Sequence, residues 1–283
     1  MQGKVVVLTG GTSGIGEAAA LNLAAMGARL VLVARDSLRA AATRQSLRGF
    51  AHSTYFADLS SVSETERVAR EIAAAEPHID VLINNAGVIS AQRQLTAEGH
   101  ELTFATNHLA YFVLTQGLLG RLLASAPARI VNTASEVHRG AQLDFEDLQS
   151  AQDYSAYGAY GKSKLANMLF TRELARRLSG SGVTANCLHP GVVASRLGQP
   201  RAGDGGDPSA ASFLSSNGIT VEEGAETVVY LASSPEAAQM TGEYFVQGRA
   251  IPPSQEAQDY IAGEKLWKES ERLAGVEFRI GRG

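Results

Sequence analysis

The sequence predicts an α/β protein in which a doubly wound parallel sheet is covered by helices on both faces. Two observations predict this fold class. Short apolar runs rich in β-branched residues alternate with longer helical patterns from the first residues onward. The apolar runs do not alternate with polar residues, as expected for strands that are buried on both faces. A regular strand–helix alternation of this kind gives one parallel sheet with helices on each side.

Six of the apolar runs are predicted to be strands. In chain order they are Lys4–Leu8, Arg29–Ala34, Thr54–Phe56, Val81–Ile83, Arg129–Asn132 and Val183–Leu188. Helices are predicted between them, over Gly16–Met26, Leu38–Leu47, Ser63–Ala75, Thr96–Leu123 and Tyr157–Leu178. Local chemistry supports two of the helix starts, because Asp36 suits a side-chain cap and Ser63 with Glu66 suits a capping box.

Composition and charge exclude several classes of protein. Of the 283 residues, 45% are hydrophobic and 19% are charged, so the chain is neither a disordered segment nor a disulfide scaffold. A net charge of −4 without any cluster of Lys or Arg argues against a nucleic-acid partner. Cys187 is the only cysteine, and no Cys/His spacing suits a metal site. The start MQGKVVVLTGG lacks the pattern of a signal peptide, so we expect a cytoplasmic protein.

Two long segments bear on the domain organisation. Length alone allows about two domains of roughly 150 residues, but we expect residues 1–283 to form one, because α/β domains often reach this size. Leu102–Gly120 carries no formal charge over 19 residues, about the length of a membrane span. Its polar side chains nevertheless favour a buried helix over a membrane span.

Gly198–Gly218 is rich in Gly, Pro and Ser. We interpret this loop as a substrate lid, with a disordered insert as the alternative.

The first predicted strand leads into the glycine-rich turn Thr9-Gly-Gly-Thr-Ser-Gly-Ile-Gly16 and then into a helix. Glycines let the backbone approach a pyrophosphate, and the free N–H groups at the start of a helix face the anion. A glycine-rich stretch by itself is often only a tight turn, but the order strand, glycines, helix favours a dinucleotide site. We expect the cofactor to contact Gly10, Thr12, Ser13, Gly14, Ile15 and Gly16.

The residues after the second strand bear on the choice of dinucleotide. NAD sites usually place an acidic residue here to bind the ribose 2′-hydroxyl. This chain has Arg35, whose guanidinium suits the 2′-phosphate of NADP(H), and we therefore favour NADP(H). Asp36 is the competing candidate and would favour NAD(H), although its position suits a helix cap.

Polar or small residues also follow the later strands. The carboxylate of Asp58, beside Leu59, is placed to accept from an adenine amino group. Small residues after the fourth strand leave room for the adenosine ribose, and the adjacent Asn side chains suit links between neighbouring strands; the residues are Asn84, Asn85, Ala86 and Gly87. After the sixth strand, the stretch Pro190–Ser195 is expected to hold the nicotinamide carboxamide through Pro190, Val193 and Ser195.

A catalytic group is indicated by Tyr160 and Lys164, which are four residues apart and therefore on one helical face. A nearby cation lowers the pKa of a phenol from about 10 and makes it a usable proton relay. Ser135 ends the fifth strand, where its hydroxyl is placed to polarise a substrate carbonyl. Asn107 lies within the uncharged helix, where a buried amide needs partners.

Taken together, these motifs resemble the short-chain dehydrogenase/reductase family: Thr9-Gly-x-x-x-Gly-Ile-Gly16, Asn84-Asn-Ala-Gly87, Tyr160-x-x-x-Lys164 and Pro190-Gly191. Flanking stretches resemble its retinol dehydrogenase-like branch: NHLAYFVLT (107–115), RIVNTASEVH (129–138), YGKSKLANMLFTRELARRL (160–178), LHPGVVASRL (188–197), EGAETVVYLASSPE (223–236) and TGEYF (241–245). The resemblance extends over nearly the whole chain.

The resemblance implies a Rossmann-type domain with a seven-stranded parallel sheet and an active-site tetrad of Asn107, Ser135, Tyr160 and Lys164. In this family the Tyr exchanges a proton with the substrate oxygen, which the Ser orients, while a hydride moves to or from the nicotinamide. Water on the Asn carbonyl links the Lys to a proton relay. An Arg after the second strand accompanies NADP(H) in this branch. Many members are homodimers or homotetramers.

The chain departs from the family pattern at two positions. Ala134 stands where the branch often has a first Ser, and Ser195 replaces a Thr common in the wider family but keeps the hydroxyl. Six aromatic or imidazole side chains lie near these motifs: Tyr111, Phe112, Tyr154, Tyr157, His138 and His189. We expect core or surface roles for them, with the lining of a substrate pocket as the alternative, and we assign none of them a catalytic role.

The sequence therefore predicts an NADP(H)-dependent oxidoreductase that interconverts the carbonyl and alcohol of an apolar small molecule. Two alternatives remain open. One is an NAD(H)-preferring enzyme of the same family, and the other is a non-catalytic dinucleotide-binding sensor or scaffold. The tetrad argues against the second, because a protein that only binds the cofactor does not need Tyr160 or Ser135.

Overall fold

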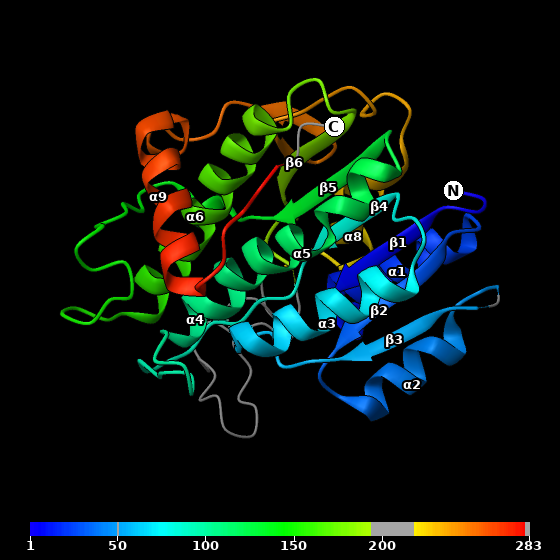
Figure 1. Ribbon diagram of the computed structural model, residues 1–283, viewed down its shortest axis with the longest axis horizontal. Helices are drawn as coiled ribbons and strands as arrows, with labels where there is room; N and C mark the ends of the chain where they lie inside the picture. The colour runs from blue at the N-terminus through cyan, green and yellow to red at the C-terminus, as the bar shows by residue number, and fades with distance from the viewer. Residues whose placement is uncertain (50, 194–217, 281–283) are drawn as a thin grey trace.

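A computed structural model describes residues 1–49, 51–193 and 218–280. Within these residues it shows one sheet with the strand order β3-β2-β1-β4-β5-β6-β7-β8 (Figure 1). The strands are β1 (Val5–Thr9), β2 (Arg29–Ala34), β3 (Ser53–Phe56), β4 (Val81–Asn84), β5 (Ala128–Thr133), β6 (Val183–His189), β7 (Tyr244–Val246) and β8 (Arg249–Ile251). Consecutive strands β3 and β4 lie on opposite sides of β1, so the direction of winding reverses between β1 and β4.

Seven of these strands are parallel, which confirms the predicted fold class. The strand count needs a small correction, because the antiparallel strand β8 pairs with β7 and adds an eighth strand at the edge. β1 and β4 are buried at every position, as continuous apolar runs require in a sheet covered on both faces.

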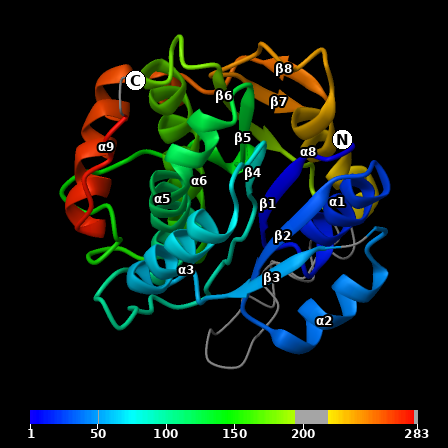
Figure 2. The ribbon, with the colours of Figure 1, turned by 45° about the vertical axis from the view of Figure 1, so that its right-hand side comes forward.

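Helices cover both faces of the sheet, as Figure 2 shows. On one face, α1 (Gly14–Ala25) packs against α8 (Val221–Ser233), and their apolar residues form a core cluster with Leu8, Leu30 and Leu32. The opposite face is covered by α3 (Val62–Ala75), α5 (Ala110–Ala124), α6 (Ala156–Arg177) and α9 (Tyr260–Ala274). The remaining helix of the first half is α2 (Ser37–Ser46).

The uncharged stretch is a buried helical segment, as predicted, but it begins later than Thr96. Leu95 and Glu101 form an isolated bridge, and the helix starts as α4 (Leu102–Phe104) with the Glu101 carboxylate accepting from the first free N–H groups. It continues through a π-type turn, η1 (Ala105–Leu109), into α5. Among the helices of the described residues, none is both long enough and apolar enough to cross a bilayer.

One predicted helix cap is confirmed and the other is wrong. The Asp36 side chain accepts from the N–H groups of Leu38 and Arg39 at the start of α2. The Ser63–Glu66 box does not form, because α3 begins at Val62, one residue before the predicted start, and its N-cap is Ser61. The side chain of Glu98, 35 residues away, accepts from the N–H of Ser63 instead, a contact that local sequence does not predict.

The C-terminal helix α9 is fixed by an aromatic cluster. Trp267 is 2% exposed and packs edge-on against Phe112 of α5, with ring centroids 5.1 Å apart. Phe170 of α6 and Phe278 complete the cluster around the same indole ring. Burial of rings this large holds α9 against the face of the sheet that carries α5 and α6.

Candidate active site

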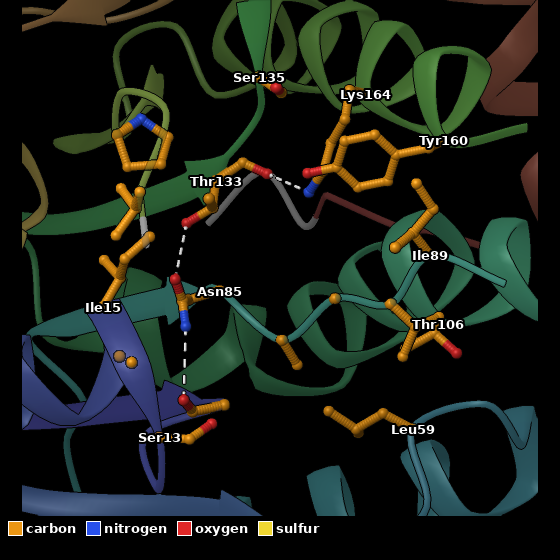
Figure 3. Close-up of a pocket in the computed structure, with 18 of the residues that line it drawn as sticks. Ser13, Ile15, Leu59, Asn85, Ile89, Thr106, Thr133, Ser135, Tyr160 and Lys164 are labelled. Carbon is orange, nitrogen blue, oxygen red and sulfur yellow. Dashed lines mark hydrogen bonds between the residues drawn. The ribbon is translucent and has the colours of Figure 1, made fainter. Parts of the chain in front are cut away.

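The candidate site is a pocket of about 890 Å³ at the carboxyl ends of the parallel strands. This volume is typical of small-molecule and cofactor sites. The pocket lies where the strand order reverses between β1 and β4, the position at which doubly wound sheets bind their ligands. Figure 3 shows that side chains from both halves of the sheet converge on it.

The turn after β1 has the geometry that a phosphate loop requires. Gly10 and Gly14 have φ values of +69° and +54°, in the region that favours glycine. A Cβ on Gly16 would lie 2.2 Å from the carbonyl oxygen of Gly10 and 2.5 Å from the Nδ2 of Asn85. All six predicted turn residues line the pocket: Gly10, Thr12, Ser13, Gly14, Ile15 and Gly16.

α1 begins at Gly14, so its first N–H groups face the pocket from this turn. Ser13 is the N-cap residue, but its side chain makes no capping hydrogen bond within the described chain. The first N–H groups of a helix have no carbonyl partner within the helix, and glycines beside them let an anion approach closely. Together they form a cradle for an anion. The cradle fits the pyrophosphate of a dinucleotide.

Asparagine side chains join the central strands, as predicted. Asn85 accepts at Oδ1 from the Thr133 hydroxyl (3.2 Å) and donates from its backbone N–H to Thr9 Oγ1 (2.9 Å). Asn84 donates to Asn132 Oδ1 at 2.9 Å in the buried sheet. These bonds tie β1, β4 and β5 together at the floor of the pocket. The predicted neighbours Asn85, Ala86 and Gly87 all line it.

One end of the pocket is lined by Arg35, Asp36, Asp58 and Leu59, the residues that the sequence predicts to lie beside the adenosine. Asp36 is therefore both a helix cap and a lining residue. The N–H of Arg39 contributes most to holding the pKa of this carboxyl below its usual value, so Asp36 is ionised and bound to α2. Asp58 is also partly engaged, because its Oδ1 accepts from the N–H and hydroxyl of Ser60.

Tyr160, Lys164 and Ser135 line the opposite end of the same pocket. Tyr160 and Lys164 both lie on α6, and the Lys164 Nζ is 5.4 Å from the centre of the Tyr160 ring. Nζ donates to the carbonyl oxygen of Thr133 at 2.9 Å, which ties α6 to the end of β5 (Figure 3). Ser135 lies two residues beyond β5 and starts the short helix η2 (Glu136–His138).

The pKa of Tyr160 is shifted in the direction opposite to the one that the sequence suggested. Desolvation raises the pKa of Tyr160, and a hydrogen bond with Ser135 offsets only part of that rise. Burial also lowers the pKa of Lys164 to about 7, so its positive charge is itself destabilised here. In these surroundings Tyr160 holds its proton at neutral pH.

Asn107 is fully buried and does not line the pocket. Its Oδ1 accepts from the N–H of Val88 at 2.8 Å, and its Nδ2 donates to the Val88 carbonyl and to Ser163 Oγ. The side chain therefore fastens the π-type turn to the segment after β4 and to α6. π-type turns often mark functional sites because they redirect backbone groups.

Beyond β6, Pro190 and Val193 line the pocket. Gly191 between them has a φ of +94°. Ser195 lies outside the described residues, and so does the predicted lid except for Gly218. Val193 forms a parallel bridge with Ile219, so the chain that resumes at Gly218 lies beside the pocket.

Several lining residues were missed by sequence reasoning. Thr106 and Thr133 reach the pocket from η1 and β5, and Val88 and Ile89 from the segment after β4. Only Thr133 carried a signal, as a hydroxyl residue at a strand end, while the role of its carbonyl as the acceptor for Lys164 left no trace in sequence. Thr9 begins the predicted turn and had no predicted role, yet its Oγ1 accepts from the N–H groups of Asn85 and Ala86.

The six aromatic and imidazole side chains divide into two groups. Tyr157 and His189 line the pocket, which is the alternative that the sequence left open for them. The others do not line it: Tyr111, Phe112, Tyr154 and His138. Over residues 1–49, 51–193 and 218–280, no three His, Cys, Asp or Glu side chains are grouped so that they could hold a metal ion.

Comparison with known sequences identifies a family. A family model described as short chain dehydrogenase matches residues 4–204. Retinol dehydrogenase 13 of Homo sapiens is 40% identical, with 97% of this chain and 86% of that protein covered. Retinol dehydrogenase 14 of Mus musculus is 39% identical, with 98% and 87% covered. The likeness to the retinol dehydrogenase branch is confirmed.

Solved structures agree with this result. An uncharacterized protein from Mycobacterium paratuberculosis matches with a TM-score of 0.80 and 31% identity, over 99% of this chain and 96% of that one. The RhlG/NADP active-site complex of Pseudomonas aeruginosa matches with a TM-score of 0.68 and 31% identity, over 86% and 94%. A Burkholderia cenocepacia short chain dehydrogenase in complex with NADP gives 0.67 and 26%, over 86% and 95%. The strand order, the pocket and these matches lead to one conclusion: the chain belongs to the short-chain dehydrogenase family, whose fold binds nicotinamide dinucleotides.

Proposed function

We propose that the protein is an NADP(H)-dependent oxidoreductase that interconverts the carbonyl and alcohol of an apolar small molecule. The observation that carries this proposal is the composition of the pocket. A phosphate cradle at Gly10–Gly16 and the side chains of Ser135, Tyr160 and Lys164 line the same cavity. A protein that only senses the dinucleotide has no need of the second group.

The proposed roles follow from the geometry. NADPH, when bound, supplies a hydride to the carbonyl carbon of the substrate. Tyr160 gives its phenolic proton to the carbonyl oxygen, so that the carbon–oxygen double bond becomes an alcohol. Ser135 donates a hydrogen bond that orients the same oxygen. Lys164, whose Nζ lies 5.4 Å from the centre of the Tyr160 ring, is placed to return the proton through water held by the carbonyl of Asn107. Lys164 would also bind the ribose of the cofactor.

The pKa directions support proton donation by Tyr160. A raised pKa means that the phenol is protonated at neutral pH, ready for a carbonyl oxygen that gains negative charge. Lys164, with a pKa of about 7, is placed to exchange a proton near neutral pH. Both properties suit reduction of a carbonyl, and the reverse reaction uses the same groups in the opposite order.

The preference for NADP(H) is supported by Arg35 and Asp36. Arg35 lines the adenosine end of the pocket, where a 2′-phosphate would lie. The carboxylate of Asp36 is already bound by the N–H groups of Leu38 and Arg39, which makes it a poor acceptor for a ribose hydroxyl. The Pseudomonas and Burkholderia structures, which are complexes with NADP, are consistent with this choice.

An apolar substrate is supported by the pocket wall beside Ser135 and Tyr160, which includes Val88, Ile89, Leu102, Val137 and Val192. The relatives named retinol dehydrogenases are consistent with an alcohol or aldehyde of this character. We also propose that residues 1–283 form one domain, because a single sheet takes strands from Val5 to Ile251.

A comparison of Tyr160→Phe with wild type tests the proposal. Wild-type protein is screened with NADPH against aliphatic and aromatic aldehydes and ketones, and with NADP⁺ against the alcohols. We expect turnover by wild type and a loss of about 100-fold or more in Tyr160→Phe, with cofactor binding retained. Tyr154→Phe is the matched control, since this phenol donates to the Ser90 carbonyl and does not line the pocket. Activity that survives in Tyr160→Phe excludes the relay, and no turnover by wild type favours the sensor.

A further inference from the structure

His138 is buried one helical turn after Ser135 and uses both ring nitrogens. Its exposed fraction is 0%, and it does not line the pocket. Nδ1 lies 2.7 Å from the carbonyl oxygen of Ser135. Nε2 lies 3.2 Å from the backbone nitrogen of Ser254, which is 116 residues away in sequence. The ring therefore spans from the end of β5 to the segment that follows β8.

The two partners determine which nitrogen carries the proton. A backbone N–H can only donate, so the Nε2 of His138 accepts from Ser254 and carries no hydrogen. A carbonyl oxygen can only accept, so Nδ1 carries the hydrogen and donates to Ser135. His138 is therefore a neutral imidazole in a single tautomer. Burial lowers its pKa, which favours the same neutral form.

Residues other than His138 also hold the turn that follows Ser135. Tyr244 of β7 donates to Glu136 at 2.8 Å, and Arg139 donates to the carbonyl of Pro252 at 2.8 Å. These bonds already fasten η2 to β7 and to the segment after β8. His138 reaches the residue before the turn, and its backbone N–H also donates to the Ser135 carbonyl, at 3.2 Å.

We propose that His138 is a positioning residue for the carbonyl–alcohol reaction, fixing Ser135 through the hydrogen bond from Nδ1 to the Ser135 carbonyl. This inference rests on the proposed function. Ser135 and Tyr160 line the same pocket, so the orientation of the Ser135 backbone sets how the Ser135 hydroxyl meets a substrate oxygen beside Tyr160. Small displacements of reacting groups are costly, and about 1 Å of misplacement lowers a rate by about 100-fold.

The proposal extends to Ser254, whose backbone N–H holds the far side of the ring. If Nε2 did not accept the hydrogen bond from Ser254, the imidazole would be free to change tautomer or to rotate. The hydrogen bond from Nδ1 to the Ser135 carbonyl would then be lost. The segment that contains Pro252 and Ser254 thus contacts Arg139 and His138 through its backbone, although none of its residues lines the pocket. This explains why a fully buried imidazole lies between two backbone segments that are distant in sequence.

Two substitutions separate positioning from packing. In His138→Asn the amide nitrogen reaches the place of Nδ1, keeping the bond to Ser135 and losing the one to Ser254. In His138→Gln the amide reaches the place of Nε2, keeping the bond to Ser254 and losing the one to Ser135. Each loses one buried hydrogen bond, so both should lose comparable stability. We expect His138→Gln to lose about 10- to 100-fold in kcat with little change in KM for NADPH, and His138→Asn to keep most of kcat.

Ser254→Ala is the matched control, because it keeps the backbone N–H that His138 accepts and should stay close to wild type in kcat. Equal losses of kcat in His138→Asn and His138→Gln would overturn the positioning role, and so would a loss of kcat in Ser254→Ala as large as that in His138→Gln.

If either His138 variant does not fold, nitrogen-15 NMR of wild type decides, with the His138 signal assigned through the Ser254 amide proton. An Nδ1–H tautomer supports the proposal and an Nε2–H tautomer refutes it. An inactive wild type counts against the proposed function, whereas an active wild type with equal variants counts against His138 alone.

Discussion

The ammonium nitrogen of Lys164 donates a 2.9 Å hydrogen bond to the carbonyl oxygen of Thr133, at a depth where the lysine is 2% exposed. The rings of Tyr160 and Tyr111 flank the same nitrogen, with centroids 5.4 and 5.9 Å away. No carboxylate forms an ion pair with Lys164 among the described residues. Burial without a counter-charge explains why the pKa of Lys164 falls to about 7.

Replacing Lys164 with Met should increase stability while removing activity. The folded-state pKa of Lys164 is lowered from 10.5 to about 7, so between these values the unfolded chain binds the proton more strongly. Wild-type stability therefore rises with pH from about 7 to 10, and below about 7 the lysine imposes its full penalty. Lys164→Met removes this penalty, which is at most about 5 kcal/mol at about 1.4 kcal/mol per pKa unit.

Urea unfolding at pH 7 and pH 9.5 measures this effect. We expect the stability gained by Lys164→Met to be larger at pH 7 than at pH 9.5. Lys162→Met is the control, because Lys162 lies on the same helix and is only partly buried against Ser150. A gain for Lys164→Met that does not change with pH would show that the ammonium is not destabilised by burial.

Gly16→Ala should abolish cofactor binding and lower stability. The added Cβ would lie 2.2 Å from the Gly10 carbonyl oxygen and 2.5 Å from Asn85, so the phosphate turn must move. Overpacking of this kind costs about 1–3 kcal/mol. Thermal unfolding with and without NADPH tests this, and we expect a lower melting temperature and no stabilisation by the cofactor.

The control for Gly16→Ala is Gly120→Ala in α5. A Cβ on Gly120 meets nothing within 4 Å, so this substitution should stabilise the helix by about 0.5–1 kcal/mol. Normal binding of NADPH to Gly16→Ala would contradict the assignment of the turn as the phosphate cradle.

Arg35→Ala should weaken NADPH more than NADH. A charge-assisted hydrogen bond contributes about 1.5–3 kcal/mol, so we expect KM for NADPH to rise by about 10- to 100-fold while KM for NADH stays nearly constant. Arg44→Ala removes the same charge from α2 without touching the pocket and serves as the control. An equal effect of Arg35→Ala on the KM values for NADPH and NADH would contradict the proposal that Arg35 binds the 2′-phosphate.

Cys187 should not react with thiol reagents while the protein is folded. The side chain is 1% exposed, and burial raises its pKa to about 12, so thiolate is scarce at neutral pH. As the chain has a single cysteine, a colorimetric thiol titration reports on this site alone. We expect reaction only after denaturant is added, and rapid labelling of native protein at pH 8 would show that β6 opens locally.

Most of the fold was predictable because its signals are local. The apolar runs marked six strands, and the glycine spacing marked the turn after β1, since both depend on residues that are neighbours in sequence. The start of α3 was not predictable in this way. Its first N–H groups are held by Glu98 from a loop 35 residues further along, whereas the predicted capping box assumed a partner within the helix.

The site shows the same division. The sequence by itself determined the fold class and the glycine turn, and it singled out Ser135, Tyr160 and Lys164 as residues of the pocket. Spacing along strands and helices is enough to place them. Only the tertiary structure decided how these groups are solvated, and with it the directions of the pKa shifts at Tyr160 and Lys164. It also joined His138 to Ser254 across 116 residues. Burial and hydrogen bonding depend on elements brought together by folding, so no local pattern records them.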